Sequence, residues 1–252
     1  MNNFWINPEK KPQIIADTSS YLVLYKPPYI HTAPLLPGEE NTLLAWAARI
    51  YPEIVRIRGQ KPVEGGLIHR LDYETHGLVL CAKTQKAYEQ LMVQQKAGRI
   101  LKEYDAVSRS VSPIKELYIT NNIIQSAFRP YGKGHKAVRP VEADHVLAAG
   151  KVIYQTEILL CQEIKNTYYF RLRIKKGFRH QIRCHLAWIG RSLLNDFLYG
   201  NCDSTISDKN AAQSKALAFL ALRASSIAFS DPGTGKNAEI IIPNTVSCPK
   251  EC

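Results

Sequence analysis

The stretch from Gly65 to Lys83 constrains the fold of this 252-residue chain more than any other segment. It brings a histidine, an arginine, an aspartate and a threonine together and then continues into an apolar run at 77–82. A short apolar run bounded by polar residues and glycine predicts a buried strand. Charges that lead into a buried strand lie at the edge of a core, where Asp72 is held in place and still reachable. An aspartate after a leucine also serves simple turns, so a working role for Asp72 needs support from the rest of the chain.

The chain carries 33 lysine and arginine residues against 22 aspartate and glutamate residues, a net charge of +11. This surplus favours a polyanionic partner such as a nucleic acid, the alternative being a basic protein without one. Basic side chains gather in a glycine-containing loop, on one face of a predicted strand and at one margin of a predicted helix. Together they predict a groove that follows nucleic-acid phosphates. The loop residues are Lys133, Lys136 and Arg139, the strand residues are Arg171, Arg173 and Lys175, and the helix residues are Arg179 and Arg183.

No apolar run approaches the length of a membrane span, and the N-terminal residues lack the pattern of a signal peptide. We therefore expect a cytoplasmic protein with no membrane partner. Six cysteines occur at scattered positions and none forms a Cys-x-x-Cys pair, which argues against a zinc ribbon. In a reducing compartment we expect them to remain thiols. A monomer is the default oligomeric state.

Strands and helices are interspersed along the chain and predict one α+β domain around a large mixed sheet. Strands are predicted at 21–25, 102–107, 152–160 and 167–174. Helices are predicted from residue 41 or 42 to about 51, from 84 to about 97, and over a third segment that contains 179–189. Residues 129–139 are predicted to form a basic loop and 201–210 an exposed loop. An apolar stretch at 216–224 and two short strands close the chain.

Five residues also permit a metal site, because histidine and carboxylate bind zinc and iron. They are His69, Asp72, His76, His180 and His185. Metal-binding histidines on a helix are four residues apart and share a face, whereas His180 and His185 are five apart. We therefore favour hydrogen-bonded positioning roles for these two histidines and expect no metal.

Five segments, in chain order, resemble the motifs of the RluA family of pseudouridine synthases. Residues 69–77, HRLDYETHG, resemble HRLD-x-x-T-S-G, and residues 102–107, KEYDAV, resemble K-x-Y-x-A-x-V. Residues 177–200 resemble G-R-T-H-Q-I-R-V-H-L-A and its G-D-x-x-Y-G ending. Residues 220–235 resemble the closing L-A-L-H-A motif, and residues 21–34 the opening K-P-x-G segment. The resemblance runs from about Tyr21 to Pro243, nearly the whole chain.

This resemblance implies an RNA-modifying isomerase that converts uridine to pseudouridine without a cofactor or a metal. It implies the pseudouridine synthase fold, an extended, mostly antiparallel mixed sheet with a central active-site cleft flanked by helices and loops. Residues 1–252 would form a single catalytic domain, with no separate N-terminal RNA-binding domain. The resemblance assigns catalysis to Asp72, stacking on the target base to Tyr104, and pairing with Asp72 to Arg183. RNA contacts are assigned to Arg70, which can fill the space left by the flipped base, and to His69, Thr75, Lys133, Lys136, Arg139, Arg179, His180 and Leu222.

Three positions depart from the family motifs. His76 stands where the family has serine, Phe178 replaces the first arginine of G-R-T-H-Q, and Arg223 replaces the histidine of L-H-A. These departures suggest a subfamily with altered substrate contacts. None of them removes the aspartate, the tyrosine or the pairing arginine.

The reaction requires a base that has left the stack, which costs a few kcal/mol. An aromatic platform such as Tyr104 offsets much of this, since stacking contributes about 1–3 kcal/mol per base. Asp72 must be ionised, and a guanidinium beside it favours that state. Three routes remain open: addition to the uracil ring, attack on the anomeric carbon, and removal of a ribose proton. Ribosomal and transfer RNA are both open as substrates, and the alternative function is a non-catalytic RNA-binding protein that uses the same groove.

Overall fold

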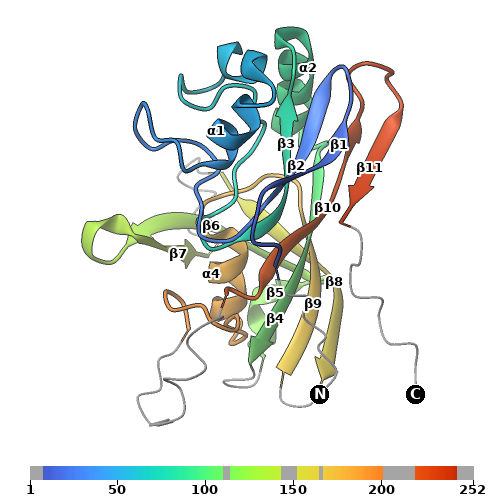
Figure 1. Ribbon diagram of the computed structural model, residues 1–252. Coiled ribbons are helices and arrows are strands. Elements are labelled where there is room, and N and C mark those ends of the chain that lie inside the picture. Colours follow the sequence, from blue (N-terminus) through green and yellow to red (C-terminus); the bar gives the residue numbers. More distant parts are fainter. Residues whose placement is uncertain (1–7, 110–113, 143–151, 165–166, 201–218, 243–252) are drawn as a thin grey trace. The chain divides into compact units, whose positions relative to one another are not determined.

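The computed structural model describes residues 8–109, 114–142, 152–164, 167–200 and 219–242 (Figure 1). The chain divides into two compact units, one made of Met1–Glu103 and Arg223–Cys252 and the other of Tyr104–Leu222. Each unit has its own strands and its own helices. Within the described ranges, no helix has the length and apolar character that a bilayer crossing requires.

The strands of the first unit pair in the order β1, β2, β3, β10, with β11 also paired to β10. The pair of β3 and β10 is parallel and the other pairs are antiparallel. Every residue of β2 and β3 is buried, which confirms the strand predicted from the apolar run. The bounds are β1 (Gln13–Asp17), β2 (Tyr21–Lys26), β3 (His76–Ala82), β10 (Leu222–Ser230) and β11 (Asn237–Ile241).

Two helices of the first unit begin at threonines, as predicted. The side chain of Thr42 accepts the N–H of Ala45 at the start of α1 (Leu43–Ala48), and a short 3₁₀ turn, η1 (Pro52–Arg56), follows. The side chain of Thr84 accepts the N–H of Ala87 at the start of α2 (Gln85–Lys96). These bonds satisfy backbone donors that have no partner within the helix. The apolar face of α2, with Tyr88, Leu91 and Met92, packs into the core that β2 and β3 also build.

The strands of the second unit pair in the order β4, β9, β8, β6, β5, with β7 also paired to β6. The pairs β5–β6, β6–β7, β6–β8 and β8–β9 are antiparallel. The first residues of β4 belong to the first unit. Figure 1 shows the β6–β7 hairpin extending outward, with helix α4 beside it. The bounds are β4 (Leu101–Arg109), η2 (Glu116–Tyr118), β5 (Ile119–Thr120), β6 (Ile123–Tyr131), η3 (Lys133–His135), β7 (Ala137–Val141), β8 (Tyr154–Ile164), β9 (Thr167–Ile174) and α4 (Gln181–Trp188).

Two local predictions were wrong. The basic segment 129–139 is mostly a hairpin, because β6 continues to Tyr131 and β7 begins at Ala137, so that only 132–136 form a loop. Arg179 does not share a helix with Arg183, because His180 has a left-handed backbone (φ 57°) and α4 begins only at Gln181. The predicted exposed loop at 201–210 and the first residues of the apolar stretch lie outside the described residues.

Candidate active site

Asp72 lies half-buried in the loop before β3, and the residues on both sides of it are held by the segment that follows β2. The hydroxyl of Thr32 donates to the carbonyl of Leu71 (2.9 Å) and accepts the N–H of Leu71 (3.1 Å). On the other side, the N–H of Tyr29 donates to the carbonyl of Tyr73 (2.8 Å). The backbone is therefore fixed one residue before and one residue after Asp72, which sets the position from which its carboxylate projects.

Lys26, the last residue of β2, is fully buried beneath the same loop. Its Nζ donates to the carbonyls of Pro27 (2.9 Å), Ile30 (2.9 Å) and Tyr73 (3.2 Å). Burial lowers the pKa of Lys26 to about 7, and the carboxylate of Asp72 acts in the opposite direction. Three acceptors match the three N–H donors of an ammonium group, so this arrangement favours the charged lysine. Lys26 thus ties the opening motif to the central one, and its protonated form places a positive charge near Asp72.

Three other residues of the central motif were assigned to RNA contacts, and they differ in exposure. The ring nitrogens of His69 are enclosed although the residue is partly exposed, and its Nε2 accepts the N–H of Leu80 (3.1 Å). Burial, with a smaller effect of Lys102, lowers the pKa of His69 to about 3, so the ring is neutral. The hydroxyl of Thr75 is buried and has no hydrogen-bond partner among the described residues. Arg70 is 52% exposed, and its Nη1 lies 3.2 Å from a carboxylate oxygen of Glu64.

The parallel pairing of β3 and β10 requires a glycine at position 77. Gly77 has φ 121°, and a Cβ there would lie 2.2 Å from the carbonyl oxygen of Ala224, its partner in the pairing. The preceding pair is His76 opposite Arg223, and both are buried. Burial lowers the pKa of His76 to about 3, and the charge of Arg223 adds to this effect. Two of the three departures from the family motifs are therefore direct neighbours on paired strands.

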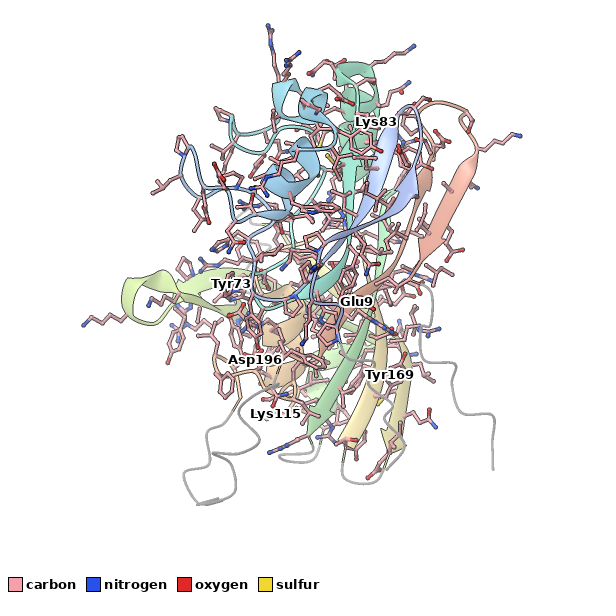
Figure 2. The ribbon with its side chains drawn as sticks, viewed as in Figure 1. Glu9, Tyr73, Lys83, Lys115, Tyr169 and Asp196 are labelled. Carbon is pink, nitrogen blue, oxygen red and sulfur yellow. The ribbon has the colours of Figure 1, made fainter. Side chains whose placement is uncertain are left out.

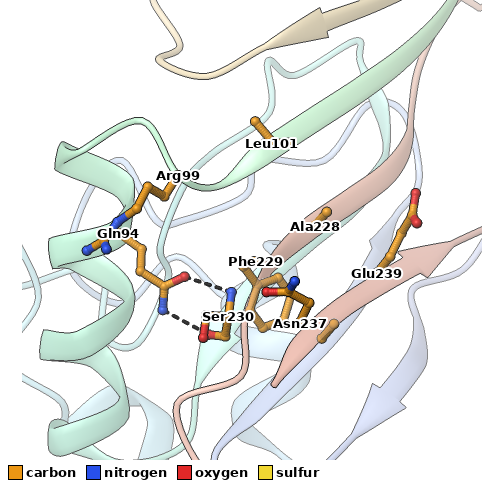
Figure 3. A pocket seen from close by; sticks show the side chains of 9 residues that line it. Gln94, Arg99, Leu101, Ala228, Phe229, Ser230, Asn237 and Glu239 are labelled. Carbon is orange, nitrogen blue, oxygen red and sulfur yellow. Dashed lines mark hydrogen bonds between the residues drawn. The ribbon is translucent and has the colours of Figure 1, made fainter. Parts of the chain in front are cut away.

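A pocket of about 670 Å³ lies in the first unit, lined by residues of α2, β10 and β11 together with Arg99 and Leu101 (Figure 3). Gln94 spans from α2 to β10: its side-chain amide donates to the carbonyl of Ser230 (2.8 Å) and accepts the N–H of Ser230 (2.8 Å). None of the residues assigned to catalysis or RNA contacts lines this pocket. It is therefore separate from the candidate site.

Tyr104 is buried in β4 of the second unit. Next to it in sequence, the carboxylate of Asp105 accepts a hydrogen bond from the hydroxyl of Tyr169 on β9 (2.6 Å; Figure 2 labels Tyr169). Burial and the charge of Asp105 raise the pKa of Tyr169 to about 12, so Tyr169 remains a donor. This bond ties β4 to β9 at Asp105, the residue after Tyr104.

The predicted basic face of β9 is partly paired with acidic groups. The Nε of Arg171 lies 3.6 Å from Asp105, and Nη1 of Arg173 lies 3.6 Å from Glu157. Lys175 follows the end of the strand at Ile174. The net positive charge of this face is therefore smaller than its arginines suggest.

Arg183 of α4 forms a buried ion pair with Asp196, labelled in Figure 2. Its Nε donates to Oδ2 (2.8 Å) and its Nη2 to Oδ1 (2.9 Å), and both side chains are at most 2% exposed. The same carboxylate accepts the backbone N–H groups of Leu198 (3.0 Å) and Tyr199 (3.1 Å). This two-bond geometry fixes the plane of the guanidinium, because the fork of arginine matches the two oxygens of a carboxylate.

Tyr199 connects the Arg183–Asp196 pair to the β6–β7 hairpin. Its hydroxyl accepts the N–H of Val138 on β7 (2.8 Å) and hydrogen-bonds to Nδ1 of His180 (3.1 Å). Its ring lies 5.5 Å from the guanidinium carbon of Arg183. The positioning role predicted for His180 thus has a partner in the structure, whereas its predicted contact with RNA stays a prediction.

The three basic residues predicted in one loop do lie around one pocket. Lys133, Lys136 and Arg139 line a pocket of about 430 Å³ between the hairpin and α4. Arg179, on the exposed segment before α4, donates through Nη2 to the carbonyl of Ala137 on β7 (3.3 Å). The described structure therefore brings these four basic groups to the same hairpin. Leu222, by contrast, is a buried residue at the start of β10.

His185 is buried in α4 between two hydroxyl groups, those of Ser126 (2.9 Å) and Thr156 (2.9 Å). Burial lowers the pKa of its ring to about 3. This confirms the hydrogen-bonded role that was preferred for His185. In the part of the chain that the structure describes, no three His, Cys, Asp or Glu residues are grouped so as to hold a metal ion.

Residues 20–188 match the family described as RNA pseudouridylate synthase. The chain belongs to this family. Ribosomal large subunit pseudouridine synthase D of Blochmanniella floridana is 30% identical over 196 residues, which cover 77% of this chain and 56% of that protein. The protein of the same name from Yersinia pestis is 29% identical over 197 residues, 78% of this chain and 55% of that protein. The chain thus spans about half the length of the curated relatives that it matches.

Two solved structures share the fold of this chain. The human RNA pseudouridylate synthase domain containing 1 aligns with a TM-score of 0.64 and 16% identity over 95% of this chain and 86% of that one. The human domain containing 4 aligns with a TM-score of 0.61 and 16% identity over 91% of this chain and 87% of that one. These alignments confirm the predicted pseudouridine synthase fold. The strand pairs described above confirm that the strands are mostly antiparallel.

Sequence reasoning missed three residues of the site: Lys26, Thr32 and Asp196. Each lies inside a segment that resembles a family motif. A lysine is seldom fully buried, so nothing in its spacing pointed to Lys26 as an internal tie. The aspartate of the G-D-x-x-Y-G ending was the available signal for Asp196.

Proposed function

We propose that this chain is an RNA pseudouridine synthase and that Asp72 carries out the isomerisation of uridine. Membership of the RNA pseudouridylate synthase family supports the reaction. The observation that carries the assignment of Asp72 is the way its loop is held, with Thr32 bound to Leu71 on one side and Lys26 bound to Tyr73 on the other. A catalytic group gains most when its backbone is already in place before the substrate binds.

Tyr104 is proposed to stack on the target base, and Arg183 to hold the carboxylate of Asp72. Asp196 accepts hydrogen bonds from Nε and Nη2 of Arg183. These two bonds support a guanidinium that is held in one orientation. A planar, oriented donor favours the ionised form of a second carboxylate. Each of the three open routes, to the ring, the anomeric carbon or a ribose proton, needs Asp72 in that form.

The proposed substrate is structured RNA, bound with its phosphates along the hairpin residues Lys133, Lys136 and Arg139 and beside Arg179. The names of the relatives favour ribosomal RNA over transfer RNA for this chain. We further propose that the protein acts in the cytoplasm as a monomer.

Pseudouridine mapping tests the function directly. Total RNA from cells with and without the gene is compared, and RNA from the deletion strain is then treated with the purified protein. The proposal predicts that one or a few pseudouridines disappear in the deletion strain and return on treatment. The non-catalytic alternative predicts RNA binding with an unchanged map, and that result would refute the enzymatic assignment.

A further inference from the structure

We propose that the pocket between the β6–β7 hairpin and α4 holds an unpaired base of the RNA substrate other than the target uridine. The inference rests on the proposed function, because it takes RNA as the ligand. Tyr104, to which stacking on the target base is assigned, is not among the residues that line this pocket. We therefore assign the pocket to a second base of the same RNA.

The walls of the pocket suit a flat, apolar group. Tyr131 from the end of β6, Trp188 from α4, and Leu198 and Tyr199 from the turn after α4 all line it. Tyr131 is 54% exposed and Leu198 is 40% exposed, so these side chains are available to a ligand. A volume of about 430 Å³ falls within the range of small-ligand pockets. Aromatic rings of this kind bind unstacked bases with little sequence preference.

The rim of the pocket suits phosphate. Lys133, Lys136 and Arg139 line it and are exposed. The guanidinium carbon of Arg139 lies 5.4 Å from the centre of the Tyr131 ring, so a charge and an aromatic surface are presented together. Basic groups around an aromatic surface favour a nucleotide over an apolar peptide, because only the nucleotide offers both a ring and a negative charge.

Hydrogen bonds and ring stacking hold two walls of the pocket in place. The hydroxyl of Tyr199 is fixed by Val138 and His180, and the indole of Trp188 stacks on Tyr118 at 4.1 Å between ring centres. At the tip, Gly132 has φ 78° and has no atoms within 4 Å of a Cβ built there, so the loop is open. Two walls are therefore rigid, and a base would lie against the Tyr199 ring that packs on Arg183.

The test measures binding, which does not depend on turnover. The probe is a fluorescein-labelled, mixed-sequence, single-stranded RNA of about 12 nucleotides, within the site sizes known for such binding. Polyphosphate with the same number of phosphates is the comparison ligand, since it has the charge but no bases. Tyr131→Ala is expected to weaken RNA binding about tenfold, or about 1.4 kcal/mol, and to leave polyphosphate binding unchanged.

Two further variants make the result specific. Tyr131→Phe keeps the ring and should bind RNA like the wild type. The double variant Lys133→Gln/Lys136→Gln should weaken both ligands and lower the slope of log affinity against log salt by about 1.4, or about 0.7 for each lysine. Equal losses for RNA and polyphosphate in Tyr131→Ala, or no loss for either, would overturn the base subsite.

Photocrosslinking gives an independent reading of the same site. RNA carrying 5-iodouridine should attach to the peptides that contain Tyr131 or Trp188, whereas attachment only elsewhere contradicts the proposal. A chain that bound bases in this way but made no pseudouridine would disprove the proposed function and leave the pocket assignment standing. The two proposals therefore fail separately.

Discussion

Replacing Asp196 by asparagine tests whether the buried ion pair with Arg183 stabilises the second unit. Asparagine has nearly the same shape and keeps one oxygen for the N–H groups of Leu198 and Tyr199. It loses the negative charge and one of the two acceptors for the guanidinium. Arg183 is 2% exposed, so water cannot replace the charge that Asp196 supplied.

The size of the effect follows from that burial. Removing one partner of a buried ion pair costs about 3–5 kcal/mol, because the remaining charge loses its ion-pair partner in a site closed to water. Because asparagine retains one acceptor oxygen, the loss in free energy of unfolding for Asp196→Asn should lie near the lower end of this range, at about 3 kcal/mol. Adding Arg183→Met should recover most of this loss, since the buried guanidinium that lost its ion-pair partner is then removed as well.

Urea unfolding, followed by circular dichroism, measures the free energy of unfolding of each variant. Asp231 provides the matched control: its carboxylate also accepts two backbone N–H groups, those of Gly233 (2.7 Å) and Thr234 (3.4 Å), but the residue is only partly buried and these bonds are exposed to solvent. Asp231→Asn should change stability by no more than about 0.5 kcal/mol. Equal losses in Asp196→Asn and Asp231→Asn, or no recovery in the double variant, would refute the reasoning about the pair.

The other predictions concern the buried histidines. His185 has a pKa near 3 in the folded chain and an ordinary value near 6.5 when unfolded, so the unfolded chain binds the extra proton between these values. The stability that this residue contributes is therefore complete above pH 6.5 and falls as the pH decreases. His185→Gln should make the slope of the free energy of unfolding against pH, between pH 6.5 and 5, shallower by up to about 1.4 kcal/mol per pH unit. Identical slopes for the wild type and the variant would contradict this. His76 and Arg223 are direct neighbours, so His76→Ser and Arg223→His should couple by at least about 0.5 kcal/mol in a double-mutant cycle of urea unfolding. Additive losses would show that the two departures from the family motifs are independent.

Most of the fold was predictable because local chemistry decides it. Thr42 and Thr84 were predicted to begin helices because a threonine hydroxyl can accept a backbone N–H that has no partner within the helix. In the structure both hydroxyls make this bond. The buried strand β3 followed from its unbroken apolar run. The hairpin at 129–139 was missed because its glycines and basic residues are typical of a loop, while its pairing depends on a partner strand that periodicity does not reveal.

The site was predictable as a set of residues but not as a set of contacts. The motifs named Asp72, Tyr104 and Arg183, yet nothing in their spacing indicated that Arg183 would bind Asp196, thirteen positions away. The contacts of Lys26 could not be predicted either, because its acceptors lie in two loops that are far apart in the sequence, Pro27 and Ile30 in one and Tyr73 in the other. Arg179 left the predicted helix because His180 adopts a left-handed backbone, which helical spacing alone does not exclude.

Tritium release from RNA labelled at carbon-5 of uridine tests the central claim most directly, with RNA from the deletion strain as substrate. Glu74→Gln is the control, because it neutralises a different carboxylate of the same loop. The wild type and Glu74→Gln should both release tritium. Asp72→Asn should bind the RNA nearly as tightly as the wild type and release none. Release by Asp72→Asn at a rate near that of the wild type would contradict the assignment of Asp72 as the catalytic residue.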